Sequence, residues 1–484
     1  MQEYSKKMPR EIIQDYFHCN ISEFGFQDLH DLVVRKDNCV LCGTCISICP
    51  RIGINGNEPS LLDYDPECSL CYKYCAQTYF PKEFFEKEIF SGHTTKNPLI
   101  GHYQKVMATR STNKDILEVS QNGGTVSSLL IYALNEGLID GVLLTGKDEN
   151  WMPKPIIVRT IKEIMDSRGS IYALASTLLP YKDAINKYKL KRLAFVGMPC
   201  QIQAVRKLQY FSPLSDEFGK FNLVIGLFCT SNYSYDSMKD IIQKEIGVQI
   251  NNVKKLDVSK GKFIVYTKDG DIKDIKINFL KKYSWPSCQY CKDYTAEFSD
   301  ISIGSVGAQE NSWNSVIVRS DFGMKLIEDA LKSDIIISSN KVKRSEIEKT
   351  SLRKKLRVSK INEKLIYALK LFNIPELEAK TYITLLSLEN ADLSMLSTIL
   401  KREPNEINSA LKFLKQRNWI SLVNGFFRPN NPVHLFKKEI QNLKEKFEND
   451  LKEFKLGAFK ELETIYIKNN LKNIKNNILL EDFF

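Results

Sequence analysis

The stretch Cys39-Val40-Leu41-Cys42-Gly43-Thr44-Cys45-Ile46-Ser47-Ile48-Cys49-Pro50 spaces four cysteines as C-x2-C-x2-C-x3-C-P. Bacterial ferredoxins bind a 4Fe-4S cluster with this spacing, because three thiolates on one tight loop reach three irons and the fourth reaches a neighbouring cluster. The alternative is a structural zinc knuckle, which uses paired C-x2-C hooks instead of a triple followed by Cys-Pro. The spacing therefore favours iron–sulfur chemistry over zinc.

A second, incomplete copy of this motif follows. Cys68, Cys71 and Cys75 are spaced C-x2-C-x3-C, which matches the last three cysteines of a ferredoxin motif whose first position falls on Asp65. In two-cluster ferredoxins the last cysteine of each run ligates the other cluster. We therefore expect one cluster on Cys39, Cys42, Cys45 and Cys75, and a second on Cys49, Cys68 and Cys71.

The second expected cluster lacks one thiolate. Asp65 or Cys19 could supply the missing ligand, or the site could hold a 3Fe-4S cluster with no ligand there. A carboxylate is a harder and poorer iron ligand than a thiolate. We expect this second cluster to be the more labile of the two.

Length and composition describe a folded protein of about three domains. The chain has 484 residues, 43% hydrophobic and 11% aromatic, and a net charge of +11 that favours anionic partners in general. Clustered cysteines in a long chain indicate metal ligands in a reducing compartment. Residues 1–17 lack the apolar segment of a signal peptide, and no run approaches about 18 apolar residues. We expect a cytoplasmic protein without a membrane span.

Residues 100–335 show the pattern of an α/β body. Ser120-Gln121-Asn122-Gly123-Gly124-Thr125 precedes a helical pattern, and its glycine pair could leave backbone N–H groups free for a phosphate or a flavin edge. A plain helix-capping turn fits the pair equally well. No G-x-G-x-x-G follows a strand, so a Rossmann NAD site is not supported. Strands are expected at 141–146, 193–198 and 223–228, and helices at 126–137 and 202–208.

Four further cysteines lie in this body. Cys200 and Cys229 each follow an expected strand, and Cys288 and Cys291 form a C-x2-C hook. Taken singly, Cys200 and Cys229 look like ordinary buried cysteines. Taken together, the four make another complete ligand set, for an iron–sulfur cluster or for zinc.

From about Gly101 to Arg319 the sequence resembles the coenzyme F-420 (F420) hydrogenase/dehydrogenase beta-subunit family. With the cysteine-rich insert ahead of it, the layout is most similar to the input subunit of reduced-F420 dehydrogenases. The segments that carry the resemblance occur in the family's order: Ser120–Gly124, Pro199–Gln201, Gly226–Cys229, Lys260–Phe263 and Cys288–Ser305.

The resemblance implies an oxidoreductase that binds FAD and a core 4Fe-4S cluster. It would exchange hydride with F420 and single electrons with a ferredoxin or a larger redox complex, with the flavin converting between the two. Direct hydride transfer needs no acid or base, so no catalytic residue is assigned. The implied ligands of the core cluster are Cys200, Cys229, Cys288 and Cys291. The implied lining of the flavin region is Ser120, Gln121, Asn122, Gly123, Gly124, Thr125, Ser170, Tyr172, Lys260, Gly261, Lys262 and Phe263.

One position departs from the family. Relatives commonly show Ser-Lys-Tyr where this chain has Ser170-Ile171-Tyr172. Losing that lysine removes a positive charge near the cofactor, which lowers the expected affinity for anionic F420. An oxidoreductase that uses another organic substrate is therefore the alternative within the same class.

The C-terminal third changes character after a charged segment, 336–360, that we expect to be a solvated linker. Helical patterns are followed by a hairpin that turns at Asn424-Gly425, which together predict a winged helix. This segment resembles the TrmB-like regulator domain, so a redox-sensing transcription regulator is a third hypothesis. Glu403 and Glu406 at the start of the expected recognition helix weaken the case for DNA and favour protein docking or dimerisation.

The tail carries Phe436, Ile440, Leu443, Phe447, Leu451 and Phe454 at spacings of three and four. This pattern fits a coiled-coil seam that would form a homodimer, and equally a single helix packed on its own domain. The expected fold class is an α/β core with an N-terminal ferredoxin-like insert and an all-α, winged-helix C-terminal domain. The expected segments are the insert (1–95), the core (96–335), the linker (336–360), the winged helix (361–435) and the C-terminal helix (436–484).

Overall fold

The computed structural model describes residues 24–63, 68–90, 92–211, 214, 219–308, 312–358 and 363–470. Cys19 and Asp65, the two expected substitutes for the missing ligand, lie outside these ranges. The chain forms two compact units, Met1–Lys360 and Ile361–Phe484, and each is described by itself.

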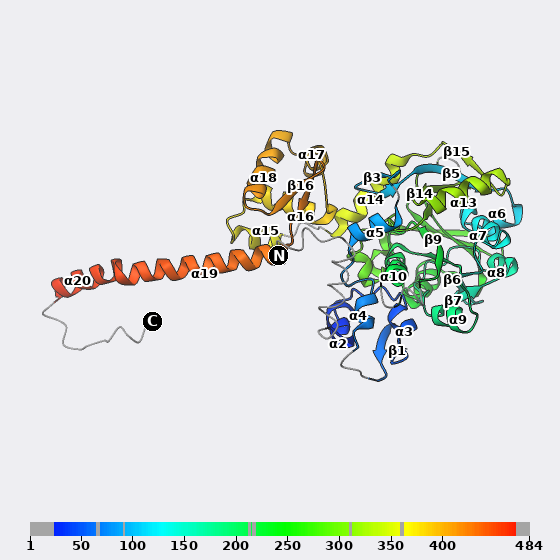
Figure 1. Cartoon of the computed structure of the whole chain (residues 1–484), viewed down its shortest axis with the longest axis horizontal. Helices are drawn as coiled ribbons and strands as arrows, with labels where there is room; N and C mark the ends of the chain where they lie inside the picture. Colours follow the sequence, from blue (N-terminus) through cyan, green and yellow to red (C-terminus); the bar gives the residue numbers. More distant parts are fainter. Residues whose placement is uncertain are drawn as a thin grey trace. The chain divides into compact units, whose positions relative to one another are not determined.

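An eight-stranded sheet forms the centre of the first unit, in the order β15-β5-β14-β13-β9-β8-β6-β7 (Figure 1). β6, β8, β9 and β13 are parallel to one another, and the strands outside them are antiparallel. The strands are β5 (Lys105–Ser111), β6 (Gly141–Lys147), β7 (Pro153–Val158), β8 (Leu193–Gly197), β9 (Phe221–Leu227), β13 (Ile301–Gly304), β14 (Asn314–Val318) and β15 (Ile336–Ser339).

Helices cover both faces of this sheet, so its parallel strands are buried on both sides and read as continuous apolar runs. Every residue of β8 is buried. One face packs against α5 (Lys82–Ile89), α9 (Tyr181–Asn186) and α10 (Pro199–Tyr210). The other packs against α7 (Thr125–Asn135), α8 (Ile161–Asp166) and α13 (Asp321–Lys332). The expected α/β core is confirmed, with its strands and helices within two or three residues of the predicted positions.

A small antiparallel sheet beside the main one holds β10 (Val253–Ser259), β11 (Lys262–Thr267) and β12 (Ile272–Lys276). Lys260 and Gly261 are the two-residue turn between β10 and β11, and both have positive φ (48° and 75°). Turns with two positive φ values match the twist of a hairpin. The other elements of this unit are β3 (Thr95–Asn97), β4 (Gly101–Tyr103), α6 (Lys114–Val119), α12 (Tyr235–Asp240), η2 (Ile241–Glu245), η3 (Ile250–Asn252), η4 (Ile277–Tyr283) and η5 (Pro286–Gln289).

The cysteine-rich N-terminal region packs against the α/β core. Two short helices start within its two cysteine motifs, and Gly43, with φ 89°, precedes the first of them. A Cβ on Gly43 would lie 3.0 Å from the Leu179 nitrogen, so this contact with the core needs glycine. The elements are α2 (Phe26–Leu29), η1 (His30–Val34), α3 (Thr44–Ile48), β1 (Ile52–Asn55), β2 (Glu58–Leu61) and α4 (Leu70–Tyr74).

The segment 336–360, expected as a solvated linker, instead forms β15 and the helix α14 (Arg344–Val358). β15 pairs with β5 at the edge of the main sheet. Ile347 and Ser351 of α14 are fully buried, and the Ser351 hydroxyl donates to the Leu99 carbonyl. Although most side chains of this helix are charged, its buried residues recur every three or four positions and so form one buried face.

The second unit begins with the helices and hairpin predicted for a winged helix. Asn424 and Gly425 form the turn of the hairpin with φ of 50° and 81°, and Trp419, fully buried, packs edge-on against Tyr382 at 4.8 Å between ring centroids. The elements are α15 (Glu363–Lys370), α16 (Glu376–Leu388), α17 (Leu393–Leu400), α18 (Pro404–Gln416), β16 (Ile420–Val423) and β17 (Phe426–Pro429). The helical, winged C-terminal region is confirmed.

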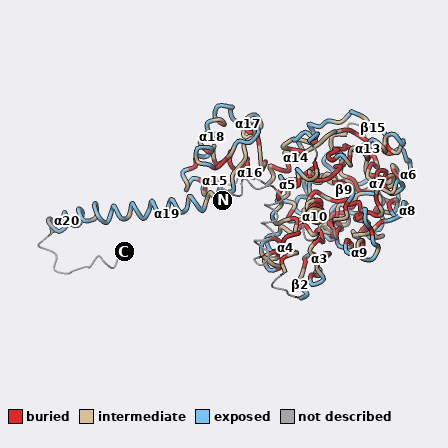
Figure 2. Tube along the Cα trace, viewed as in Figure 1, coloured by how far each residue is buried: buried red, intermediate tan, exposed pale blue. Residues whose placement is uncertain are grey.

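Two consecutive helices, α19 (Pro432–Leu456) and α20 (Ala458–Asn470), follow the winged helix. Phe436 packs against Trp419 and Phe372. Further along, Ile440, Leu443, Phe447 and Phe454 are between 40 and 67% exposed (Figure 2). The start of the predicted seam, Phe436, is therefore packed on its own domain, while the later apolar residues of the seam are exposed. Among the described residues, no helix has the length and apolar character needed to cross a membrane.

Candidate functional site

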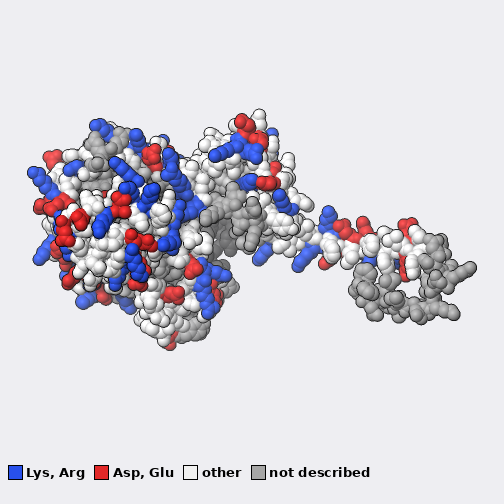
Figure 3. Space-filling model, turned by 180° about the vertical axis from the view of Figure 1, so that it is seen from behind, with Lys and Arg blue, Asp and Glu red and all other residues white. Residues whose placement is uncertain are grey.

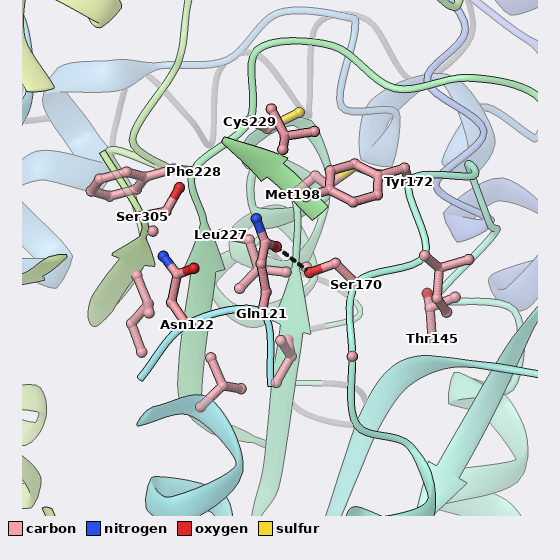
Figure 4. A pocket seen from close by; sticks show the side chains of 18 of the residues that line it. Gln121, Asn122, Thr145, Ser170, Tyr172, Met198, Leu227, Phe228, Cys229 and Ser305 are labelled. Carbon is pink, nitrogen blue, oxygen red and sulfur yellow. Dashed lines mark hydrogen bonds between the residues drawn. The ribbon is translucent and has the colours of Figure 1, made fainter. Parts of the chain in front are cut away.

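A cavity of about 410 Å³ opens where the four parallel strands end. Its lining includes residues at or near the carboxyl ends of β6, β8, β9 and β13, namely Thr145, Gly197, Leu227 and Gly304. Thr145 and Leu227 are seen in Figure 4. In open α/β sheets, ligands bind in the crevice outside the carboxyl ends of the strands. The topology of the sheet therefore identifies this cavity as the candidate site.

The loop Ser120–Thr125 forms one wall of the cavity, and all but Gly123 of its residues line it. Its role in flavin binding stays a prediction. The Gln121 side-chain oxygen accepts a hydrogen bond from the Ser170 hydroxyl at 2.6 Å (Figure 4). Gly124, with φ 68°, caps α7, whose first turn also lines the cavity. Free N–H groups at a helix N-terminus favour anionic groups.

The glycine pair also has a purely structural reason. A Cβ on Gly123 would lie 2.6 Å from the Thr109 carbonyl oxygen, and a Cβ on Gly124 would lie 2.5 Å from the Ile116 side chain. Neither position has room for a side chain, so the loop can pack against β5 and α6 only with glycine. The helix-capping alternative and a cofactor role are both compatible with this geometry.

Tyr172 lines the cavity, while the predicted segment Lys260–Phe263 does not. Tyr172 has a positive φ of 61°, and its ring packs edge-on against Phe263 at 5.5 Å between centroids. Phe263 is fully buried and supports the tyrosine from behind. Lys260, Gly261 and Lys262 lie at or beside the hairpin turn, and their role in cofactor binding stays a prediction.

Several residues that line the cavity were not predicted from the sequence. Arg168, Met198, Phe228 and Ser305 line it, and Met198, Phe228 and Ser305 are seen in Figure 4. Three of them directly follow or lie next to the ends of β8, β9 and β13. The position of a residue just past a parallel strand is the signal that could have found them.

The four cysteines of the α/β core come together beside this cavity. Cys200 lies in the first turn of α10, directly after β8, and Cys229 follows β9 and lines the cavity. Burial, opposed by Lys354 and assisted by Cys288 and Cys291, raises the pKa of Cys229 to about 12. Cys200, Cys229, Cys288 and Cys291 are called the core group below.

Two cations from α14 reach the core group, and neither was predicted. The Lys354 ammonium donates to the Cys229 carbonyl at 2.6 Å and to the Asp293 carbonyl at 2.7 Å. Arg357 donates to the Thr230 carbonyl at 3.1 Å and to the Cys288 carbonyl. Burial alone lowers the pKa of Lys354, but Cys291, Cys229 and Asp293 outweigh it, so the pKa is raised and the side chain stays charged.

The N-terminal cysteines form two adjoining groups. Group A is Cys39, Cys42, Cys45 and Cys75: burial, with Cys42 and Cys75, raises the pKa of Cys39 to about 12. Group B is Cys49, Cys68 and Cys71: burial, with Cys68, Cys49 and Cys75, raises the pKa of Cys71 to about 12. The spacing analysis predicted these sets as the ligands of two clusters. The structure brings the members of each set together, and ligation stays a prediction.

Two contacts join group A to the core group. The Trp285 indole nitrogen donates to the Cys39 carbonyl at 2.7 Å, while the Trp285 carbonyl accepts from the Cys288 amide at 3.0 Å. At the end of α10, the Lys207 ammonium donates to the Cys75 carbonyl at 2.6 Å. Cys200 and Lys207 are separated by about 10 Å along this helix. The two groups are therefore held at a short, fixed separation.

Four cysteine thiols are a donor set that both an iron–sulfur cluster and zinc can use. Within the part of the chain that the structure describes, no three His, Cys, Asp or Glu side chains are placed to hold a single metal ion. Four thiolates on one zinc ion lie about 3.8 Å apart, since each is about 2.3 Å from the metal in a tetrahedron. A cubane spreads its thiolates over separate irons and needs wider spacing. The preference for clusters over zinc at the N-terminal cysteines therefore rests on the C-x2-C-x2-C-x3-C-P spacing of the sequence.

The comparisons with known proteins match both units. Residues 106–181 and 190–344 match the N-terminal and C-terminal family models of the coenzyme F420 hydrogenase/dehydrogenase beta subunit. Residues 369–432 match the model of the sugar-specific transcriptional regulator TrmB. Both resemblances seen in the sequence are confirmed.

Individual relatives agree. The chain is 36% identical over 238 residues to the coenzyme F420 hydrogenase subunit beta of Methanosarcina barkeri, covering 49% of this chain and 81% of that one. It is 35% identical over 269 residues to the protein of the same name from Methanothermobacter thermautotrophicus, covering 54% and 95%. Among solved structures, a chain of the xenon-derivatised F420-reducing nickel–iron hydrogenase complex of Methanosarcina barkeri superposes with a TM-score of 0.53 and 33% identity, covering 57% and 96%.

Proposed function

The chain belongs to the coenzyme F420 hydrogenase/dehydrogenase beta-subunit family of F420-dependent oxidoreductases, and we propose that it exchanges hydride with F420 at the cavity and single electrons through the cysteine groups. The observation that carries the proposal is Cys229, which belongs both to the cavity wall and to the core group. A two-electron site and a one-electron site therefore adjoin at one residue.

The walls of the cavity fit a flavin. Apolar side chains at the strand ends, among them Leu144, Val196 and Ile303, face Gln121, Asn122 and other polar groups of the loops. A volume of about 410 Å³ lies in the range of cofactor pockets, which combine apolar walls with a few placed polar groups. When bound, FAD supplies the conversion between hydride and single electrons.

The residues of this chain have three tasks in this proposal. The first turn of α7 presents N–H groups to the anionic part of the cofactor. Gln121 and Ser170, held to each other by a hydrogen bond, present polar groups to the ring edge. Tyr172, fixed by Phe263, shapes the wall and excludes water.

We further propose 4Fe-4S clusters at the core group and at group A, and a less stable cluster at group B. The contacts through Trp285 and α10 join group A to the core group, and Cys71 of group B lies near Cys75 of group A. We infer the order core group, group A and group B for electron transfer. The solved relative is a chain of a hydrogenase complex, so we infer a ferredoxin or a larger redox complex as the electron partner.

An anaerobic titration with reduced F420 tests the central proposal. Flavin absorbance followed by cluster absorbance should bleach in turn, and the chain with Gln121→Leu should bind F420 more weakly. Absence of flavin bleaching in protein that contains flavin and iron would exclude F420 as the substrate.

A substitution at Ile171 distinguishes F420 from another organic substrate. Ile171 lines the cavity and is 8% exposed, at the position where relatives commonly carry lysine. If F420 is the substrate, Ile171→Lys should tighten its binding, because a cation would face the anionic cofactor. A variant that binds F420 no better than the parent chain would favour the alternative substrate.

The second unit supports a further candidate function, as a redox-sensing regulator. The observation in its favour is the winged-helix architecture together with the TrmB match at 369–432. Against DNA stands the acidic start of α18, where Glu403 and Glu406 form a capping box. Lys and Arg on the face shown in Figure 3 are mixed with acidic side chains rather than gathered in one patch. We favour protein docking or dimerisation through α19.

Binding to random-sequence DNA at several salt concentrations, with oxidised and with reduced protein, distinguishes these uses. A steep salt dependence that changes on reduction would favour the regulator. Equilibrium sedimentation of the same samples would show whether the second unit forms a dimer.

A further inference from the structure

Lys354 is a buried cation held by backbone carbonyls. Its side chain is 4% exposed. Its ammonium bonds the carbonyls of Cys229 and Asp293, which lie on two separate segments of the core. Both acceptor oxygens are neutral, and the acidic side chains near the ammonium are those of Cys291, Cys229 and Asp293.

Arg357, one turn further along α14, repeats this arrangement. It donates to the carbonyls of Thr230 and Cys288, again neutral groups on the two segments that carry the core group. Lys355, between them, forms an ion pair with Glu297 at 2.7 Å that fixes the helix against the core. One helix therefore holds the backbone around Cys229, Cys288 and Cys291 with two charged side chains.

Lys354 and Arg357 lie beside the core group, where a bound cluster would change its charge on reduction. An iron–sulfur cluster becomes more negative by one unit on reduction, and its reduction potential depends on net charge and hydrogen bonds around it. A fixed cation in a buried setting interacts strongly with such a charge, because the effective dielectric constant is low. The more negative, reduced form gains more from this interaction than the oxidised form.

We propose that Lys354 and Arg357 are positioning residues that hold the core cysteine segments and raise the reduction potential of the cluster bound there. The inference rests on the proposed function only in requiring a cluster at the core group. It goes beyond the family resemblance, because the matched segment ends at residue 344 and both residues lie after it.

A redox titration with chemical mediators, monitored by electron paramagnetic resonance, tests the inference without F420. The core signal is identified as the one lost in Cys200→Ser. In Lys354→Met, the ratio of reduced to oxidised core cluster at a fixed potential should fall at least about tenfold, equal to about 59 mV for a one-electron couple. Lys354→Arg should restore most of the ratio, and the signals of the N-terminal cysteines should not move.

Lys349→Met is the matched control, since Lys349 is an exposed lysine on the same helix, and it should leave the potential unchanged. If Lys354→Met fails to fold, Arg357→Gln provides the second variant, with a smaller fall in the same direction. An unchanged potential in a folded variant with full iron content would overturn the inference, as would absence of any signal that depends on Cys200. A parent chain that does not react with F420, together with a potential that shifts in Lys354→Met, would count against the proposed substrate and not against this inference.

Discussion

Two buried lysines lie beside two of the cysteine groups, and their pKa values shift in opposite directions although burial lowers both. Lys207 beside group A is fully buried, and burial lowers its pKa to about 7 although Cys75 and Cys42 act against the change. Lys354 beside the core group is almost as buried, yet its pKa is raised because Cys291, Cys229 and Asp293 outweigh burial. The number of nearby acidic groups, and not burial, distinguishes the two sites.

The hydrogen bonds point to the same division of roles. Lys207 donates to three oxygen atoms, the Lys73 carbonyl, the Cys75 carbonyl and the Thr78 hydroxyl, and so ties α10 to the end of α4. Lys354 bonds two carbonyls and also interacts with the Cys291 sulfur. We interpret Lys207 as a cross-link of the fold and Lys354 as a source of charge.

The largest expected effect on stability comes from Lys207→Met. The variant removes three hydrogen bonds, although the Cys75 carbonyl still accepts from the Thr78 hydroxyl. A buried acceptor that loses its donor costs about 1–3 kcal/mol before the structure relaxes. We expect the free energy of unfolding to fall by about 3 kcal/mol, measured by urea denaturation of the full chain. The potential of the core cluster should stay as in the parent chain. A shifted core potential with unchanged stability would reverse the roles assigned to the two lysines.

Lys147 shows the effect of burial on the pKa of a lysine that has no cysteine group beside it. Lys147 packs over the Trp151 ring at 3.7 Å, and burial lowers its pKa from 10.5 to about 8. Between these values the unfolded chain binds more protons than the folded one, so the lysine's contribution makes stability rise as the pH increases from about 8 to 10.5. Relative to Lys147→Met, the parent chain should gain about 1–3 kcal/mol over this interval.

Thermal unfolding of both proteins at a series of pH values measures that difference. At pH 7 the methionine variant should be the more stable of the two, because it avoids burying a charge. Parallel pH profiles for the two proteins would show that burial of Lys147 has no energetic cost.

The smallest effect is expected for Trp285→Phe. The ring contact is kept while the hydrogen bond to the Cys39 carbonyl is lost, which costs about 0.5–1.5 kcal/mol. Because this bond joins group A to the core, amide hydrogen exchange should accelerate around residues 39–45 and stay unchanged in β8 and β9. Tyr290→Phe, at a position 56% exposed, is the control. Uniform exchange across the unit would argue against a local role for the indole.

Features that depend on residues close together in the chain could be predicted from the sequence. The apolar runs that became β6, β8 and β9 and the Asn424-Gly425 turn lie where local chemistry places them. The grouping of cysteines into groups A and B also follows from spacing within about 40 residues. In each of these cases the deciding partners are close in the chain or repeat with a fixed period.

Long-range partners decided what the sequence could not predict. Lys354 and Arg357 look like solvated charges of a linker until their acceptors, at least 61 residues away in the chain, are known. The need for Gly123 comes from the Thr109 carbonyl, which only the folded sheet brings near. Lys260 and Gly261 form a hairpin turn with positive φ, and their role in cofactor binding, which the family resemblance implied, stays a prediction.

The position of α14 has a consequence for how such chains can be fused. The helix belongs to the first unit, which extends to Lys360, and α15 of the second unit begins at Glu363. If another module replaced the chain from Arg344 onward, the first unit would lose α14 and with it Lys354 and Arg357, which hold the cysteine segments. Grafted after Lys360, the same module leaves the core intact. The natural junction lies at the second of these places, so the appended unit could be exchanged for another without rebuilding the electron-transfer machinery.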